Sequence, residues 1–237
     1  MKAMILAAGY GKRMLPLTSS LPKPLVQVQG RALIEYMLLG LAAANICEVI
    51  INVHFKAEAI VDYLGDGAQY GVNITYSYET EQLLGTGGGI KHSLPLLGAD
   101  PFLLISGDIL TNYDFSRLAH LAPDDLAHLV LVNNPEYKRE GDFALEEKRV
   151  VLGGMQFTYA NIALLSPKLF SSCAEEVFPL APVLLDAIQS SQVSGEFYNG
   201  VWFNVGTPQI VSALNQHTGK PVLSGGCPKK RVKIETK

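Results

Sequence analysis

Residues 6–25 read LAAGYGKRMLPLTSSLPKPL, and this stretch carries most of the information about the fold and the ligand. Residues 4–8 are apolar throughout, which is typical of a short buried strand, and Gly9 and Gly11 follow at once. Glycines let a backbone come close to a bulky anion with its N–H groups turned inward, while cations neutralise the anion's charge. Three cations follow the glycines: Lys12, Arg13 and Lys23. The stretch therefore predicts a strand that leads into a triphosphate-binding loop.

Two better-known phosphate-binding loops do not fit this spacing. A Walker A loop has four residues between its first glycine and the Gly-Lys-[Ser/Thr], whereas a single residue separates Gly9 from Gly11 and Arg13 follows Lys12. A dinucleotide-binding fingerprint needs a small residue where Met14 stands. The remaining alternative is an ordinary glycine-rich turn with solvated basic residues, and the third cation, held between two prolines, argues against it.

Further motifs extend this pattern along the chain. The loop reads GxGxRxxPLT over residues 9–18 and PKPL over residues 22–25. Later matches are LIEY at 33–36, GTGGG at 85–89, SGD at 106–108 and WFNVGT at 202–207. Together they resemble the signature of the sugar-1-phosphate nucleotidylyltransferases over roughly residues 1–217. Within that family the chain is most similar to the short bacterial N-acetylmuramate α-1-phosphate uridylyltransferases, by its compactness, the TGGG run and the GDF at 141–143.

The resemblance implies a reaction and a fold. Members of the family join a sugar 1-phosphate to a nucleoside triphosphate and release pyrophosphate, with Mg²⁺ as cofactor. The expected substrates are UTP and N-acetylmuramate 1-phosphate, giving UDP-N-acetylmuramate in cell-wall recycling. A guanylyl- or thymidylyltransferase for mannose or another hexose 1-phosphate is the alternative, and a non-catalytic nucleotide-sugar sensor is a further one. The implied fold is α/β, with a Rossmann-like, mixed but mostly parallel sheet flanked by helices, as in nucleotide-diphospho-sugar transferases.

The residue types suit a transfer between two anions. The sugar phosphate is a nucleophile without deprotonation, so fixed cations, backbone N–H groups and Mg²⁺ supply what the reaction needs. Arg13 is expected to hold the β,γ-phosphates with its planar guanidinium. As in the family, Lys23 is assigned to the α-phosphate and the sugar phosphate, the alternative being a solvated lysine. The expected nucleotide-binding residues are Ala7, Ala8, Gly9, Gly11, Lys12, Arg13, Lys23, Gln82, Thr86, Gly87 and Ser106.

Two residues are expected to hold the metal. Asp108 follows the apolar run 102–105, at the carboxyl end of an expected central strand, where ligands gather in open α/β sheets. Its carboxylate suits Mg²⁺, a hard ion that prefers oxygen donors, although a turn or helix cap is an alternative role. The family usually has an aspartate as second ligand in WxDxGT, and this chain has Asn204 there. Its amide oxygen can coordinate without a formal charge, so metal affinity should be lower.

The base and the sugar are less well encoded. The glycines of 85–89 are expected to leave room for a flat base whose edge Gln82 or Thr86 reads, or else to form a flexible turn that begins a helix. The sugar is assigned to polar residues in apolar or glycine-containing surroundings: Asp142, Asn161 and Glu196. Asn161 lies within the apolar strand-like segment 157–164, where a polar side chain needs a partner. Either a sugar hydroxyl or a neighbouring backbone group can be that partner.

Composition sets the remaining limits. The chain has 237 residues, 48% of them hydrophobic, and a net charge of −3, which gives no reason to expect nucleic acid or an anionic membrane as a partner. No apolar run approaches the roughly 20 residues of a membrane span. Because Met1 and Lys2 lead directly into the first strand, we expect no signal peptide and a cytoplasmic protein. The three cysteines and five histidines are scattered, which favours reduced thiols and argues against a zinc site. The oligomeric state is not encoded.

Apolar runs alternate with amphipathic segments, as in stacked βαβ units. Strands are expected at 3–8, 48–53, 72–78, 101–106, 127–133, 141–152, 160–165 and 193–198. Helices are expected at 33–44, 56–64, 88–94, 114–121, 180–190 and 208–216. We expect one domain over 1–217, with a nucleotide-binding part at about 1–134 and a sugar-binding part at about 135–217. Residues 218–237 form a glycine- and proline-containing tail whose basic run, 229–233, is expected to be a solvated terminus.

Overall fold

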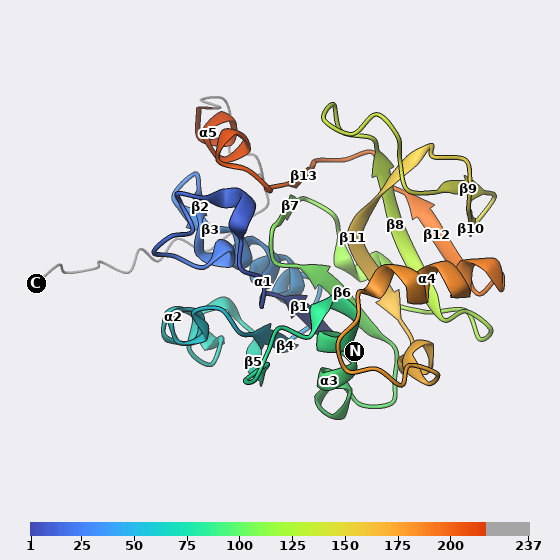
Figure 1. The fold of residues 1–237 in the computed structure, drawn as a ribbon, viewed down its shortest axis with the longest axis horizontal. Coiled ribbons are helices and arrows are strands. Elements are labelled where there is room, and N and C mark those ends of the chain that lie inside the picture. The colour runs from blue at the N-terminus through green and yellow to red at the C-terminus, as the bar shows by residue number, and fades with distance from the viewer. Residues whose placement is uncertain (217–237) are drawn as a thin grey trace, which may run out of the picture.

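A mixed nine-stranded sheet forms the centre of the molecule. The computed structural model describes residues 1–216, so the basic run at 229–233 lies outside the described residues. Figure 1 shows the sheet with helices on both faces. In order across the sheet its strands are β5 (Asn73–Tyr78), β4 (Glu48–Val53), β1 (Lys2–Leu6), β6 (Phe102–Ser106), β11 (Phe157–Leu165), β8 (Ala127–Asn133), β12 (Val193–Phe197), β10 (Arg149–Val151) and β9 (Ala144–Glu146).

Strand direction determines which residues meet at one edge of the sheet. Strands β5, β4, β1 and β6 are parallel, β11 runs antiparallel to β6 and to β8, and β12 is parallel to β8. In this register Leu6, the last residue of β1, pairs with Asn52 on one side and with Ser106 on the other. The segments after β1, β4, β5 and β6 therefore meet at one edge, together with the first half of β11. Ligands bind at this edge in open α/β sheets.

Helices cover both faces because the strands alternate apolar side chains between two cores. Helices α1 (Leu33–Ala43) and α2 (Ala57–Leu64) pack on one face, and α3 (Gly85–Leu97) and α4 (Leu180–Gln189) on the other. Within β1, Ala3 and Ile5 face the first core and Met4 faces the second, as the two-residue period of a strand requires. The mostly parallel α/β sheet expected from the sequence is confirmed.

A third, smaller core packs side chains of residues 205–214 against side chains of residues 14–33. Helix α5 (Pro208–Gln216) packs on the two-stranded hairpin of β2 (Gln27–Val28) and β3 (Arg31–Ala32). Beside it, β13 (Trp202–Asn204) pairs antiparallel with β7 (Ile109–Thr111), a short ladder that the sequence did not predict. In residues 1–216 no helix has both the length and the apolar composition needed to cross a membrane.

Two expected helices were wrong in detail. The helix expected at 114–121 is only a 3₁₀ turn, Phe115–Arg117, because the Asp114 carboxylate accepts a hydrogen bond from Ser116 N, 3.0 Å away, and closes a local turn. The helix expected at 88–94 begins three residues earlier, at Gly85, so the whole glycine run is helical.

Candidate active site

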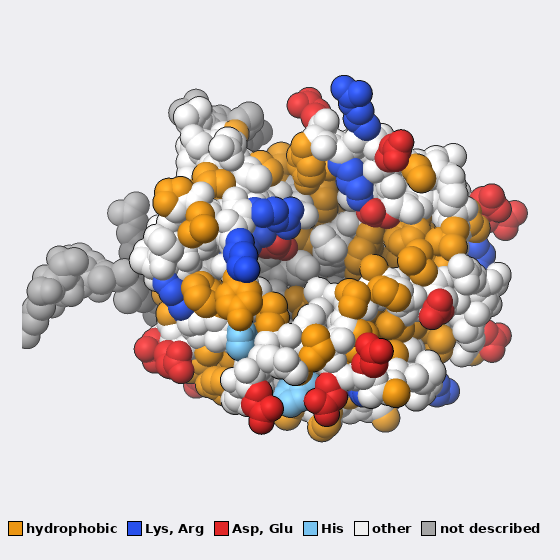
Figure 2. Space-filling view, viewed as in Figure 1, with side chains coloured by type: hydrophobic (Ala, Val, Ile, Leu, Met, Phe, Trp, Pro, Cys, Tyr) orange, Lys and Arg blue, Asp and Glu red, His pale blue; other side chains and the backbone are white. Residues whose placement is uncertain are grey.

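Two cavities adjoin at the carboxyl edge of the sheet. The first cavity, of about 380 Å³, lies over the loop after β1, and the second cavity, of about 340 Å³, lies over β11 and α4. Both are lined by Leu6, Thr86 and Ser106, which form their common wall. Figure 2 shows a hollow in the middle of this face, with Lys and Arg side chains toward β2 and β3 and hydrophobic side chains toward α4.

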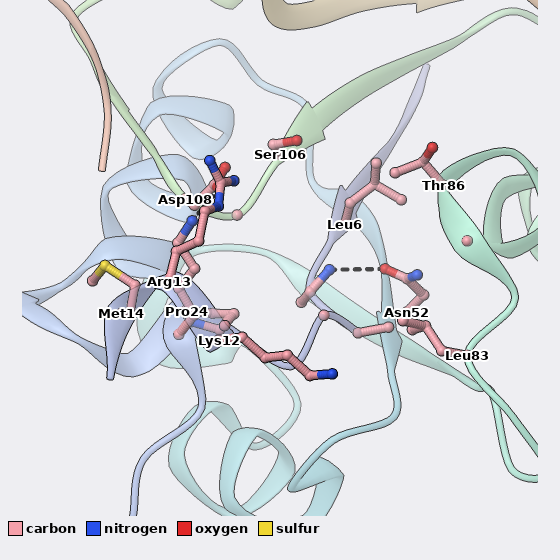
Figure 3. Close-up of a pocket in the computed structure, with 17 residues that line it drawn as sticks. Leu6, Lys12, Arg13, Met14, Pro24, Asn52, Leu83, Thr86, Ser106 and Asp108 are labelled. Atoms are coloured by element: carbon pink, nitrogen blue, oxygen red, sulfur yellow. Dashed lines mark hydrogen bonds and ion pairs between the residues drawn. The ribbon is translucent and has the colours of Figure 1, made fainter. Parts of the chain in front are cut away.

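The first cavity gathers most of the residues expected to bind the nucleotide (Figure 3). The expected residues that line it are Ala7, Ala8, Gly9, Gly11, Lys12, Arg13, Lys23, Thr86, Ser106 and Asp108. The loop is held in place by Gly11, which has a φ of 63° and whose carbonyl accepts a 2.9 Å hydrogen bond from Thr18 Oγ1. A β-carbon on Gly11 would also lie 3.0 Å from Thr18 Cγ2, so both the left-handed backbone and the close contact require glycine here.

Lys23 and Asp108 form an ion pair at the wall of the first cavity. Lys23 Nζ lies 2.5 Å from Asp108 Oδ2, and the two side chains are 12% and 23% exposed. The lysine sits in a short 3₁₀ turn, Lys23–Leu25, whose Pro24 and Leu25 are buried, so its backbone is fixed from the core side. Partial burial protects this pair from the screening that weakens surface ion pairs.

The β7–β13 ladder brings Asn204 beside Asp108. Asn204 pairs with Ile109, and Val205 N donates a 2.9 Å hydrogen bond to the backbone carbonyl of Asp108. Asp108 Oδ1 and Asn204 Oδ1 are both buried and have no hydrogen-bond partner among the described residues. Burying such atoms is unfavourable without a ligand, and two unpartnered oxygens fit a hard cation such as Mg²⁺. Residues 1–216 contain no cluster of three or more His, Cys, Asp or Glu side chains that could hold a metal alone.

Arg13 reaches the same side of the cavity. A β-carbon on Gly206 would lie 3.7 Å from Asn204 Oδ1 and 4.0 Å from Arg13 Nη1, so the guanidinium and the amide flank this glycine. Tyr137 lines the second cavity, and its hydroxyl interacts electrostatically with both Arg13 and Asp108. The pKa of this hydroxyl is raised overall, because partial burial and Asp108 raise it more than Arg13 lowers it. Lys12 instead extends from the loop away from Asp108 (Figure 3), with its ammonium 5.4 Å from the Tyr10 ring centre.

Within the glycine run at 85–89, Gly87 and Gly88 pack against another part of the protein. Gly87 N and Gly88 N each donate a 3.0 Å hydrogen bond to the carbonyl of Phe178. A β-carbon would lie 2.4 Å from Phe178 Cε2 at Gly87 and 2.1 Å from the carbonyl oxygen of Glu176 at Gly88. These glycines are buried against the segment before α4, so the space they leave is filled by protein.

Of the two residues expected to read the base edge, Thr86 lines a cavity and Gln82 does not. Thr86 lines both cavities, and its Oγ1 accepts a 2.8 Å hydrogen bond from Leu180 N, at the start of α4. Gln82 is exposed, and neither Gln82 nor Gly87 is among the residues that line either cavity. Of residues 85–89, Gly85 and Thr86 are the ones that line the first cavity.

The second cavity contains two of the three residues assigned to the sugar. Asp142 accepts hydrogen bonds from Lys138 Nζ at 2.5 Å and from Tyr159 N at 2.9 Å. Asn161 has a φ of 55° at the point where the register of β11 with β8 shifts. Leu180, Ala181 and Leu184 give the cavity an apolar wall.

Glu196 lies elsewhere. Its carboxylate accepts hydrogen bonds from the Tyr113 hydroxyl and from Arg117 Nη2, and it lines neither cavity. Burial and this contact with Glu196 raise the pKa of the Tyr113 hydroxyl.

Several lining residues were missed from the sequence. Asn52 lines the first cavity, and its signal was a polar residue inside the apolar strand 48–53. Tyr137, Lys138, Tyr159 and Trp202 line the second. The Tyr159 hydroxyl is buried without a partner among the described residues, and burial raises its pKa. Trp202 stands in the WFNVGT motif, whereas no local pattern distinguishes Tyr137, Lys138 and Tyr159 from ordinary strand and loop residues.

The family follows from a direct comparison. The model of the nucleotidyl transferase family matches residues 2–144, which include the glycine loop, Lys23, the α3 glycines and Asp108. This chain belongs to the nucleotidyl transferase family. The sequence resemblance to sugar-1-phosphate nucleotidylyltransferases is therefore confirmed.

Relatives of this nucleotidyl transferase include both types of enzyme expected from the sequence. It is 44% identical over 216 residues to the N-acetylmuramate alpha-1-phosphate uridylyltransferase of Neisseria meningitidis serogroup B, covering 87% of this chain and 94% of that protein. It is 30% identical to the mannose-1-phosphate guanyltransferase of Saccharomyces cerevisiae, with 88% of this chain covering 62% of the yeast protein.

Solved structures agree on the fold of this nucleotidyl transferase. A Bacillus anthracis protein assigned as a glucose-1-phosphate thymidylyltransferase, solved with sucrose, superposes with a TM-score of 0.76 at 22% identity, over 94% of this chain and 98% of that one. At this identity the superposition shows the fold alone.

Proposed function

We propose that the protein transfers a uridylyl group from UTP to N-acetylmuramate 1-phosphate, releasing pyrophosphate and forming UDP-N-acetylmuramate. The observation that carries this proposal is the shared wall of Leu6, Thr86 and Ser106, which allows one ligand in each cavity to meet its neighbour. The choice of UTP and of N-acetylmuramate rests on the 44% identity to the Neisseria enzyme of that name.

In this proposal each cavity takes one substrate. The triphosphate lies in the first cavity, because the glycine loop and its cations line it. The sugar phosphate lies in the second cavity, where Asp142 and Asn161 offer oxygen and amide groups to hydroxyls beside an apolar wall. The lining residues support a nucleotide-binding part in the first half of the chain and a sugar-binding part at 135–217, except that Leu6, Thr86, Leu104 and Ser106 also reach the second cavity.

The reaction is a single displacement at the α-phosphorus. A phosphate oxygen of the sugar 1-phosphate forms the new P–O bond, and the bond from the α-phosphorus to the bridging oxygen of the β-phosphate breaks. Pyrophosphate leaves with that electron pair, so no proton is transferred and no protein nucleophile is needed. Arg13 binds the β,γ-phosphates, and Lys23 neutralises charge at the α-phosphate and the incoming phosphate.

Mg²⁺ is the proposed cofactor, held by Asp108 and Asn204. When bound, it would supply positive charge to the phosphates of both substrates. The unpartnered buried oxygens of these two side chains support the assignment. Because one ligand is neutral, the protein alone offers a weak site, and oxygens from the triphosphate must complete the coordination.

Pyrophosphate release from a panel of substrates tests the function. UTP, GTP and dTTP are each combined with N-acetylmuramate 1-phosphate, mannose 1-phosphate and glucose 1-phosphate. We expect UTP with N-acetylmuramate 1-phosphate to give the highest kcat/KM. The similarity to the yeast enzyme makes GTP with mannose 1-phosphate the main competitor. A chain that binds nucleotides yet releases pyrophosphate with no pair would be a nucleotide-sugar sensor, and the proposal would be wrong.

A further inference from the structure

A buried chain of hydrogen bonds connects the two walls of the first cavity. Ala7 N donates to Asn52 Oδ1 at 2.8 Å, and Asn52 Nδ2 donates to Glu79 Oε1 at 2.6 Å. The other carboxylate oxygen, Glu79 Oε2, accepts from Leu84 N at 2.8 Å. Figure 3 shows the first of these bonds as the dashed line that ends at Asn52.

The two ends of this series of hydrogen bonds belong to different walls of the first cavity: Ala7 lines one wall, and Leu84 directly precedes the lining residues of the other. Ala7, together with Ala8, begins the glycine loop. Leu84 is the N-cap of α3 and precedes Gly85 and Thr86, which line the facing wall. Glu79 itself is not among the lining residues. Its side chain therefore connects Asn52 to Leu84 from behind the cavity wall.

The burial of Glu79 needs an explanation. Glu79 and Asn52 are each 3% exposed. None of the ion pairs in residues 1–216 includes Glu79, so its carboxylate is held by hydrogen bonds. Burying a carboxylate without a cation is unfavourable, and apolar residues of similar volume often give a core that is at least as stable. A stability role alone does not explain a carboxylate at this position.

The surroundings of Glu79 are fixed on every side. Its N–H donates a 2.9 Å hydrogen bond to the carbonyl of Val53, and its carbonyl lies 2.5 Å from His54 Nδ1. A β-carbon on Gly89 would lie 2.5 Å from Glu79 Oε1 and 2.9 Å from Asn52 Nδ2. The last glycine of the GTGGG run thus makes room for this pair, which gives that part of the motif a role.

We propose that Asn52 and Glu79 are positioning residues for the nucleotide: they fix the width of the slot between Ala7 and the start of α3. This inference rests on the proposed placement of the triphosphate in the first cavity. A slot of fixed width favours one size of base, so the pair acts on nucleotide affinity and base selection. It does not act on the sugar phosphate, which lies beyond the shared wall.

Exchanging the amide and the carboxylate between positions 52 and 79 tests this proposal. In Glu79→Gln the new amide cannot accept from both Asn52 Nδ2 and Leu84 N, and in Asn52→Asp two carboxylates face each other. In the double variant, N52D/E79Q, the amide at position 79 donates to the carboxylate at position 52. Ala7 N and Leu84 N then both keep an oxygen acceptor. Every hydrogen bond is restored with the middle one reversed.

The matched control is Ser93→Ala. Ser93 is fully buried on the same helix as Gly89. Its hydroxyl donates a hydrogen bond to the carbonyl oxygen of Gly89 at 2.8 Å and lies 2.9 Å from Ser77 Oγ, and none of these three residues lines either cavity. Its removal breaks a buried hydrogen bond beside the same strands without touching either cavity wall. The control therefore separates loss of stability from loss of slot geometry.

The measurements are the Kd for UTP and for GTP by calorimetry, the KM for each substrate, and Tm. Losing a buried hydrogen bond to a charged group is expected to raise the Kd for UTP about tenfold in each single variant. In those variants the preference for UTP over GTP should narrow while the KM for the sugar phosphate stays near the wild-type value. The double variant should regain wild-type affinity, and Ser93→Ala should lower Tm with its Kd for UTP unchanged.

Three results would overturn the proposal: single variants with unchanged Kd for UTP, a double variant that binds UTP more weakly than either single one, or a Ser93→Ala variant with the same affinity loss. Where a single variant does not fold, the double variant decides, and its failure to fold or to bind UTP also counts against the proposal. A wild-type chain that binds UTP but transfers nothing would overturn the proposed function alone. These affinities would still decide the positioning role.

Discussion

Lys23 Nζ lies 2.5 Å from Asp108 Oδ2, while the other oxygen of the same carboxylate is buried and has no partner among the described residues. One carboxylate is thus shared between a fixed cation and an open coordination position. We propose that the ammonium orients Asp108 and leaves Oδ1 free to hold a metal ion. In the proposed reaction the same ammonium would neutralise charge on the bound phosphates.

Lys23→Ala is expected to lower kcat by about a hundred- to a thousandfold, because one preorganised electrostatic contact at the reacting phosphates is worth that much. Tm should also fall, because the Asp108 carboxylate, 23% exposed, loses its ion-pair partner, so kcat is compared at a temperature where both proteins are folded. The matched control is Lys12→Ala: this ammonium lies near the Tyr10 ring and points away from Asp108, so a smaller loss is expected. Equal losses in both variants would mean that Lys23 acts only as part of a general positive field.

The metal ligands are tested by exchanging their charges. Asn204→Asp should tighten Mg²⁺ binding and lower the Mg²⁺ concentration for half-maximal rate, because a second carboxylate then faces the ion. Asp108→Asn should abolish activity, since no protein charge remains at the metal. Titrating rate against Mg²⁺, with Mn²⁺ binding to the nucleotide-free protein as a second readout, checks both. An unchanged metal requirement in Asn204→Asp would place Asn204 outside the coordination shell.

Arg13→Lys is expected to be nearly as damaging as Arg13→Ala. The proposed contact with the β,γ-phosphates uses two parallel N–H groups, a geometry that lysine lacks. The KM for UTP in the two variants measures this directly. If lysine restores most of the affinity, the guanidinium serves as a simple positive charge.

Alanine substitution should affect stability at Gly88 and UTP binding at Gly9. Gly88→Ala places a β-carbon 2.1 Å from the carbonyl oxygen of Glu176, and such overpacking is expected to cost about 1–3 kcal/mol in the free energy of unfolding. Gly9→Ala meets no atom within 4 Å, so stability should be unchanged, but its methyl group enters the phosphate side of the first cavity. Urea unfolding and the KM for UTP, measured on both variants, check this contrast. A destabilised Gly9→Ala protein would contradict the open placement of this glycine.

The strand β1 and the glycine loop after it lie where the sequence predicted them, and the loop lines the first cavity. They were predictable because the residues involved are neighbours in the sequence. A strand, two glycines and three cations follow one another within a short stretch, and Asp108 directly follows a buried strand. The position of each relative to the sheet edge is then fixed by strand direction alone. The sheet and most helices were predicted for the same reason, since they depend on hydrophobic period.

Residues whose roles depend on distant partners were not predictable. The glycines of the GTGGG run indicate that another part of the protein or a ligand comes close to the backbone there. The atoms that do so belong to Glu176 and Phe178, which no local pattern identifies. Glu196 was assigned to the sugar because it is polar within a strand, and its actual partners are Tyr113 and Arg117. For Asn204, the resemblance implied a role as metal ligand, and the β7–β13 pairing, which brings it beside Asp108, was not predicted.

The most direct test of the proposed reaction is exchange of labelled pyrophosphate into UTP, measured with and without N-acetylmuramate 1-phosphate. Because the two substrates are proposed to react directly across the shared wall, we expect no exchange with UTP and Mg²⁺ alone. When N-acetylmuramate 1-phosphate is added, UDP-N-acetylmuramate forms. Its reaction with labelled pyrophosphate in the reverse direction should then give labelled UTP. Rapid exchange without any sugar compound would reveal a uridylyl-enzyme intermediate and contradict direct transfer between the two cavities.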